Sequence, residues 1–117
     1  MPHVTTEPTR VPVPGGKLIH EHVGMVSTHT REVSVAHMVA PPGWQEPYQT
    51  PEFDEITVVV KGSIHVDCDD RRHEVTAGQS IITKAGERIR YAAGPQGAEY
   101  VAVCLPAFTP AAAHRED

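Results

Sequence analysis

The 117-residue sequence lacks features that would assign it to several large classes of protein. No apolar run approaches the roughly 18 residues that a membrane-spanning helix needs, and the first ten residues lack the pattern of a signal peptide. Basic residues are scattered apart from Arg71-Arg72, and the formal net charge is -5, so no basic stripe could follow a phosphate backbone. We therefore expect a cytoplasmic protein that binds neither membrane nor nucleic acid.

Cysteine is also scarce, with only Cys68 and Cys104 in the chain. Without a secretory segment, two thiols do not form a disulfide framework, so both are expected to be reduced. The length leaves room for one core of ordinary size and therefore for one domain.

Proline and glycine, by contrast, are plentiful, at 11 and 9 residues. β-Branched residues are concentrated between them, a pattern that predicts an all-β fold with little helix. The strongest strand signal is the run 55–61, and strands recur every eight to twelve residues or so, which is typical of a sandwich or closed barrel. Residues 1–16 are predicted to be an extended Pro/Gly-rich arm, and residues 17–117 a single domain.

The sequence contains two spaced motifs. The first comprises Pro42-Gly43, the triplet 49–51, Glu55 and Gly62; the second comprises Gly78, the triplet 84–86 and Ile89. Together they resemble the conserved motifs of the cupin family. The resemblance covers roughly residues 32–105 and implies a jelly-roll β-barrel of antiparallel strands. It also implies a homodimer, in which we expect the N-terminal arm to contribute to the interface.

The metal-ligand positions of the resemblance are altered in this chain. Gln49 and Pro51 stand where cupins carry His-x-His, Ile89 replaces the third histidine, and only Glu55 remains. A register shifted by one residue places Tyr48 and Thr50 at the His-x-His positions, again without imidazole.

A three-histidine, one-glutamate centre is therefore disfavoured, and we predict that the protein has no cofactor. The alternative is one divalent metal held by Glu55, Gln49 and His37.

The segment before Glu55 predicts a binding pocket for a small molecule. Its apolar walls would be Trp44 and Phe53, and its polar groups Gln49, Tyr48 and Glu55. The structural alternative is that the two aromatic side chains only close the end of the barrel.

Alternation along residues 88–91 places Ile89 and Tyr91 on the inward face and the two arginines outside. Without a metal, burial would raise the pKa of Glu55 and allow proton transfer together with Tyr91 or Tyr48. Two buried side chains that only stabilise each other are the alternative for Glu55 and Tyr91.

The chemistry expected of such a site is that of a metal-independent isomerase, lyase or cyclase. A metabolite-binding protein without catalysis and a metal-dependent enzyme with a non-standard ligand set are the alternatives. The predicted substrate-binding residues are Trp44, Gln49, Phe53, Ile89 and His37.

Overall fold

The computed structural model describes residues 2–116, which form an antiparallel β-barrel of jelly-roll type. The predicted arm begins at residue 1 and the predicted domain ends at residue 117; both of these residues lie outside the described part. The strands are β1 (Thr9–Arg10), β2 (Leu18–Val23), β3 (Ser34–Ala40), β4 (Asp54–Cys68), β5 (Arg71–Thr76), β6 (Ser80–Thr83) and β7 (Ile89–Leu105).

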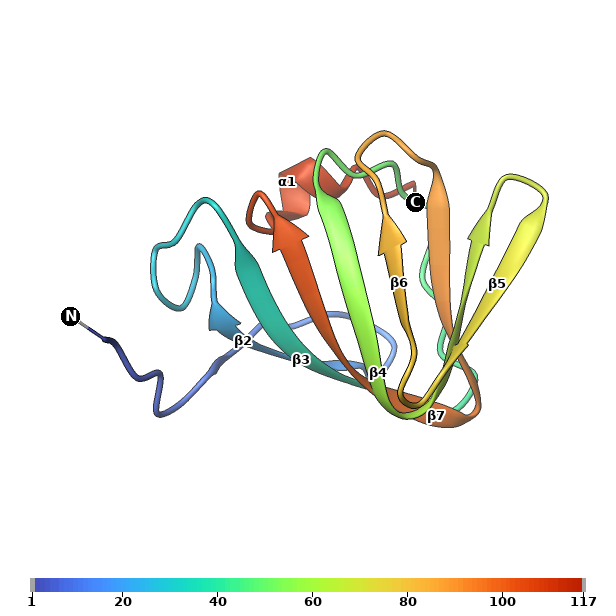
Figure 1. Ribbon diagram of the computed structural model, residues 1–117, viewed down its shortest axis with the longest axis horizontal. Coiled ribbons are helices and arrows are strands. Elements are labelled where there is room, and N and C mark those ends of the chain that lie inside the picture. The colour runs from blue at the N-terminus through green and yellow to red at the C-terminus, as the bar shows by residue number, and fades with distance from the viewer. Residues whose placement is uncertain (1, 117) are drawn as a thin grey trace.

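The strands pair in the order β1-β2-β3-β7-β4-β5, and β6 pairs with β4 outside this path (Figure 1). A short helix, α1 (Pro110–Ala113), is capped by Thr109, whose hydroxyl accepts from the Ala112 amide at 3.1 Å. The predictions of an all-β fold and little helix are therefore confirmed.

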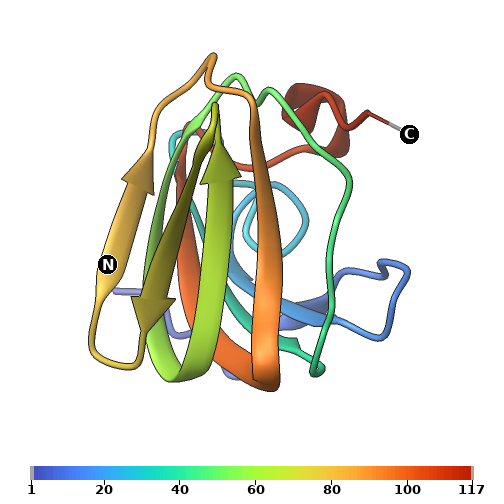
Figure 2. The ribbon, with the colours of Figure 1, turned by 90° about the vertical axis from the view of Figure 1, so that its right-hand side faces the viewer.

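β4 and β7 are the longest strands, and each of them serves both layers of the barrel. They pair over both halves, with shifts of register between Val59 and Lys61 and between Gly62 and Ile64, and residues 94–97 of β7 have no partner on β4. The first half of β4 pairs with the second half of β7, the chain then turns back, and the remaining halves pair again (Figure 2). This bend encloses the core between two layers.

The sequence predicted separate strands and a loop at residues 94–97, where the structure has one continuous β7. Gly62 explains the difference in part. It adopts a φ of 73°, and a Cβ on it would overlap the carbonyl oxygen of Gly97 on the neighbouring strand. Glycine thus lets the two bent strands approach closely enough to stay paired.

The arm joins the barrel of its own chain. β1 pairs antiparallel with β2, and the Val11 amide donates to the Ile19 carbonyl at 2.9 Å. The segment 41–53 covers another side of the barrel: it runs outside the first half of β7 from one end to the other (Figure 2). Gln49 exchanges two backbone hydrogen bonds with Ile89, at 2.9 and 2.8 Å.

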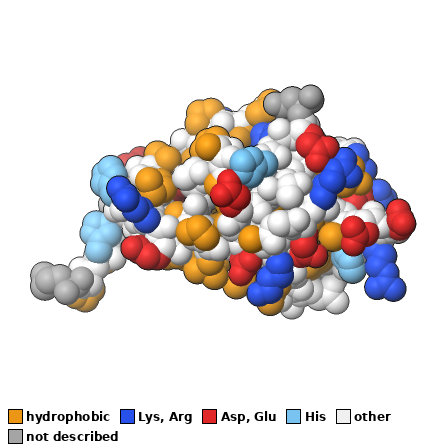
Figure 3. All heavy atoms as spheres, turned by 90° about the horizontal axis from the view of Figure 1, so that it is seen from above, with side chains coloured by type: hydrophobic (Ala, Val, Ile, Leu, Met, Phe, Trp, Pro, Cys, Tyr) orange, Lys and Arg blue, Asp and Glu red, His pale blue; other side chains and the backbone are white. Residues whose placement is uncertain are grey.

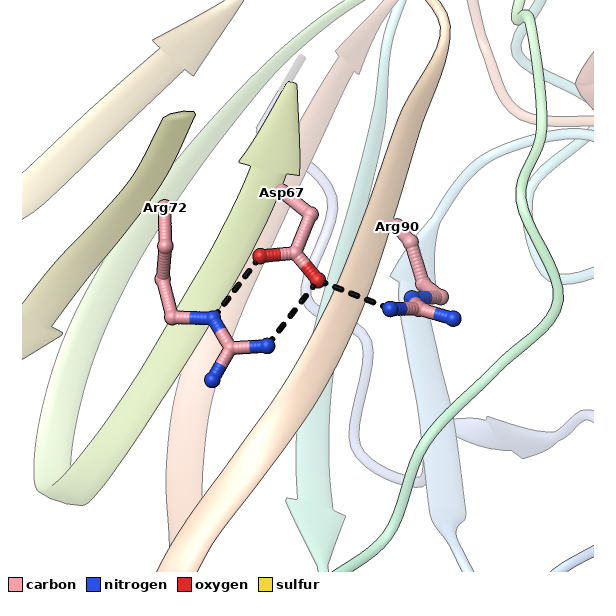
Figure 4. A network of polar contacts seen from close by, with 3 residues as sticks. All are labelled: Asp67, Arg72 and Arg90. Atoms are coloured by element: carbon pink, nitrogen blue, oxygen red, sulfur yellow. Dashed lines mark hydrogen bonds and ion pairs between the residues drawn. The ribbon is translucent and has the colours of Figure 1, made fainter. Parts of the chain in front are cut away.

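Outside the barrel, an ionic network joins three strands. Asp67 of β4 accepts from Arg72 of β5 at 2.9 Å and from Arg90 of β7 at 3.0 Å (Figure 4). These hydrogen bonds, led by that from Arg72, hold the pKa of Asp67 below its usual range. The network links the outer face of the layer formed by β5, the second half of β4 and the first half of β7.

The surface of the barrel is mixed in charge. On the face seen in Figure 3, acidic and basic side chains are interspersed. Among the described residues, no helix is long and apolar enough to cross a membrane.

Candidate functional site

The barrel encloses an inner cavity of about 60 Å³. Both layers, the arm and the segment 41–53 contribute to its wall. Its wall carries several polar side chains: Lys17, Glu21, Ser34, Glu46, Gln49, Glu55, Tyr91, Tyr100 and Arg115. An outer cavity of about 150 Å³ lies beside it and shares Lys17, Glu46 and Arg115 with it. These three charged residues therefore stand between the inner cavity and the outer one.

Glu55 points inward because alternate residues of β4 face the core. It is only 8% exposed. Burial, and next the charge of Glu46, raise the pKa of Glu55 from 4.5 to about 7, while Lys17 and the Tyr91 hydroxyl oppose the rise. Such a carboxyl group exchanges its proton near neutral pH, as a general acid or base requires.

Tyr91 reaches across the barrel from the opposite layer. Its hydroxyl lies 2.9 Å from the Thr83 hydroxyl of β6, and Thr83 is the cross-strand neighbour of Glu55. Burial and the nearby Glu55 charge raise the pKa of Tyr91 well above its usual value. Tyr91 therefore remains a neutral phenol that can donate a hydrogen bond in the cavity.

Glu46 and Lys17 add two ionisable groups that the sequence analysis missed. Glu46 is 9% exposed and Lys17 is 8% exposed. Burial raises the pKa of Glu46 and lowers that of Lys17, because it disfavours the charged form of each group. The Nζ atom of Lys17 lies 4.1 Å from the centroid of the Trp44 ring.

Two buried oxygen atoms in the cavity wall have no hydrogen-bond partner among the described residues. They are Glu46 Oε2 and the hydroxyl of Tyr100, a side chain that is 1% exposed. A buried polar atom without a partner costs about 1–3 kcal/mol, so natural proteins rarely retain one without a reason. A polar ligand in the cavity could satisfy both atoms.

The structure brings four of the predicted site residues together at the inner cavity: Glu55, Tyr91, Gln49 and Phe53. Trp44 packs in the core and lines the outer cavity instead. The inward position of Gln49 also settles the motif register in favour of the triplet 49–51.

Three other predicted site residues do not line the inner cavity. Tyr48 lies on the outer side of segment 41–53, where the guanidinium carbon of Arg88 is 3.8 Å from the ring centroid. His37 faces away from the cavity and pairs with Glu99 at 2.8 Å, because the inward residues of β3 are Ser34, Ala36 and Met38. Ile89 is fully buried in the hydrophobic cluster and lines neither cavity.

The residues at the family's ligand positions do not fit a metal centre. Pro51 and Ile89 have no donor atom, and the alternative set of Glu55, Gln49 and His37 is wrong because His37 lies outside the barrel. Within residues 2–116, no cluster of three His, Cys, Asp or Glu side chains could hold a metal ion. Lys17 places a basic group beside Glu46 and Glu55 instead.

A signal for the missed residues was present in the period-two pattern. Lys17, Ile19 and Glu21 alternate with residues that face outward, and Trp44 alternates with Glu46 in the same way. Neither Lys17 nor Glu46 was predicted to line the site, because lysine and glutamate are seldom buried. The alternation indicates the inward positions of Lys17 and Glu46 better than the usual exposure of these residue types does.

Comparison with known proteins connects this geometry to a family. The family model for the cupin domain matches residues 36–104. An "Endoribonuclease YbeY" of Myxococcus xanthus (strain DK1622) is 45% identical over 107 residues, which are 91% of this chain and 36% of that protein. The chain thus spans about a third of that relative, whose name describes a much longer protein.

Two solved structures share the fold at low sequence identity. An oxalate decarboxylase from Bacillus subtilis aligns with a TM-score of 0.81 and 17% identity, over 97% of this chain and 31% of that one. An RmlC-like cupin from Shewanella frigidimarina aligns with a TM-score of 0.76 and 17% identity, over 92% and 93% of the two chains. By its motifs, its barrel and the matching family model, this chain belongs to the cupin domain family.

Proposed function

We propose that this cupin binds a small polar molecule in the inner cavity and transfers a proton to or from it through Glu55. The observation that carries the proposal is the burial of Glu55 in the cavity wall, with a pKa of about 7. Such a group loses and regains a proton at little cost near neutral pH. An isomerase, a lyase and a cyclase each need such a step.

The neighbouring groups support this chemistry. Tyr91 remains protonated and stands ready to donate a hydrogen bond to an oxygen atom that gains negative charge. Phe53 and Phe108, with ring centroids 5.8 Å apart, form an apolar wall of the same cavity. Such a wall limits the water around the reacting groups, which strengthens their electrostatic interactions.

Proton transfer can be tested before the substrate is known. A panel of small hydroxy, keto and amino compounds would be incubated with the protein in deuterated water, and proton NMR would follow the loss of C–H signals. We expect exchange into at least one compound, and a loss of about 100-fold or more in Glu55→Gln. Glu99→Gln, which changes a carboxylate on the outer face, is the matched control.

Exchange that persists unchanged in Glu55→Gln would contradict the assigned role of Glu55. A compound that binds saturably but is recovered without exchange would favour the second function, that of a metabolite-binding protein. The unpartnered Glu46 Oε2 and Tyr100 hydroxyl support the binding step in either case.

A further inference from the structure

Lys17 differs from the other lysines of the chain in its surroundings. Lys61 and Lys84 are exposed, whereas Lys17 is buried in the wall that the inner and outer cavities share. It stands immediately before β2, where alternation turns it toward the core. A small molecule in either cavity would therefore meet its amine.

The contacts of Lys17 leave its amine open to reaction. Its Nζ lies 4.1 Å from the ring centroid of Trp44 and 5.2 Å from that of Tyr100. Within residues 2–116, it forms no ion pair with a carboxylate, although the charges of Glu46 and Glu55 act on it from further away. The amine is held between aromatic faces rather than fixed by a salt bridge.

Burial favours the neutral form of this amine. It lowers the pKa of Lys17, as does Arg115, while Glu46 and Glu55 raise it. A neutral lysine is a nucleophile toward carbonyl carbon, whereas the ammonium form is not. Glu55, with its raised pKa, supplies the acid that such a reaction needs.

The unpartnered oxygens indicate which groups the ligand carries. Glu46 Oε2 and the Tyr100 hydroxyl line the same cavity as Lys17, and both are buried. A ligand hydroxyl can donate to one and accept from the other. The cavity of about 60 Å³ is well below the roughly 150 Å³ of a cavity that holds benzene, so the enclosed part of the ligand is small.

We propose that Lys17 is a nucleophile that forms an imine with a small hydroxy-aldehyde or hydroxy-ketone bound in the cavity. The inference rests on the proposed function, because the same cavity binds the ligand and Glu55 supplies the proton. It adds a substrate class and a covalent step.

In that step the lone pair of Nζ attacks the carbonyl carbon, and a proton passes from the nitrogen to the oxygen to give a neutral carbinolamine. The C–O bond then breaks, the oxygen leaves as water with a proton from Glu55, and the nitrogen lone pair completes the C=N bond. The imine acidifies the neighbouring C–H, whose proton the resulting Glu55 carboxylate can accept.

The test uses glycolaldehyde with sodium cyanoborohydride, which reduces an imine to a stable secondary amine. After short incubations at about pH 7, peptide mass spectrometry would compare labelling at Lys17, Lys61 and Lys84 in one wild-type molecule. We expect Lys17 to be labelled at least about threefold faster than either exposed lysine. In Lys17→Met the fast labelling should disappear, whereas in Lys61→Met it should remain.

Labelling of Lys17 at a rate equal to or below that of Lys61 and Lys84 would overturn the inference. Titration of Trp44 fluorescence with glycolaldehyde, without the reductant, separates this failure from that of the proposed function. A saturable change without fast labelling would leave ligand binding in the cavity intact and remove only the imine. If Lys17 is not labelled faster, Trp44 fluorescence does not change and no compound of the panel exchanges its C–H protons, both proposals fail.

Discussion

Three ionisable side chains from distant parts of the sequence share the interior of this barrel. Lys17 immediately precedes β2, Glu46 belongs to the segment that follows β3, and Glu55 comes from β4. Burial shifts the pKa of each toward neutrality, upward for the acids and downward for the base. Burial therefore narrows the difference between the pKa values of the two acids and that of the base.

Glu55 should make the stability of the protein depend on pH. Its pKa is raised from 4.5 in the unfolded chain to about 7, so the native state binds the proton more tightly. Its stabilising contribution is complete below about pH 4.5 and is lost as the pH rises through about 7, a difference of the order of 3 kcal/mol. Denaturant titrations of the wild type and Glu55→Gln between about pH 4 and 8 should show a smaller decline in the variant. Parallel profiles would contradict the raised pKa.

Tyr100 carries a buried hydroxyl that has no hydrogen-bond partner within residues 2–116. Tyr100→Phe should therefore raise the free energy of unfolding by about 1 kcal/mol while weakening ligand binding. Tyr91→Phe is the matched control, because its hydroxyl is 2.9 Å from that of Thr83 and its removal should lower stability by about 1 kcal/mol. Urea denaturation of both variants checks that the two substitutions change the free energy of unfolding in opposite directions. A loss of stability in Tyr100→Phe would show that its hydroxyl is already satisfied.

The sequence indicated part of this site. Glu55 and Gln49 followed from motif spacing, and Tyr91 from its alternation with Ile89. Tyr48 was misplaced because the motif allowed two registers, which only the backbone pairing of Gln49 with Ile89 resolves. Lys17 was missed because it is 38 positions from Glu55 in sequence, and only the closed barrel brings β2 to face β4.

At the scale of elements, the bend of β4 determines how the two layers meet. Gly62→Ala should lower the free energy of unfolding by about 3 kcal/mol or more, because the new Cβ would overlap the Gly97 carbonyl at a positive φ. Gly78→Ala is the control. It has a similar φ of 87° but no atom within 4 Å of the added Cβ, so it should cost only about 1 kcal/mol. Equal losses in chemical denaturation would contradict the close approach of β4 and β7.

Most of the strands could be predicted because turns and β-branched runs are local signals. The β4–β5 hairpin follows from its short connection, and β2 and β3 are consecutive strands joined by residues 24–33. The continuity of β7 through Gly94-Pro95-Gln96-Gly97 could not be predicted, since these residues are typical of a loop. These residues have no cross-strand partner on β4, which pairs with β7 at Ala93 and again at Ala98, and Gly97 has a φ of 76°.

At the scale of the whole molecule, the homodimer expected from the sequence remains a prediction. The outer face of the layer that contains β6, the first half of β4 and the second half of β7 offers a surface for the dimer contact. Four apolar side chains between 42% and 60% exposed lie there on β4, β6 and β7: Val58, Val60, Ile82 and Leu105. Grouped apolar side chains on a sheet face are typical of surfaces that another chain covers.

Sedimentation velocity should show a dimer that Ile82→Lys dissociates, because a buried lysine without a partner is costly. Val4→Lys, at a valine of the arm that is 75% exposed, is the control and tests the contribution of the arm. Dissociation by Val4→Lys alone would favour the arm as the contact surface. A monomeric wild type would contradict the dimer itself.

Residues near both ends of the sequence contribute to the cavities, since Val13 and Arg115 line both of them. A ligand that gains affinity from contacts with these residues must, by thermodynamic reciprocity, stabilise their positions to the same extent. Filling the barrel should thus slow amide hydrogen exchange around both positions together, although they are separated by almost the whole sequence. Amide hydrogen exchange near either end of the sequence then indicates whether the interior of the barrel is occupied.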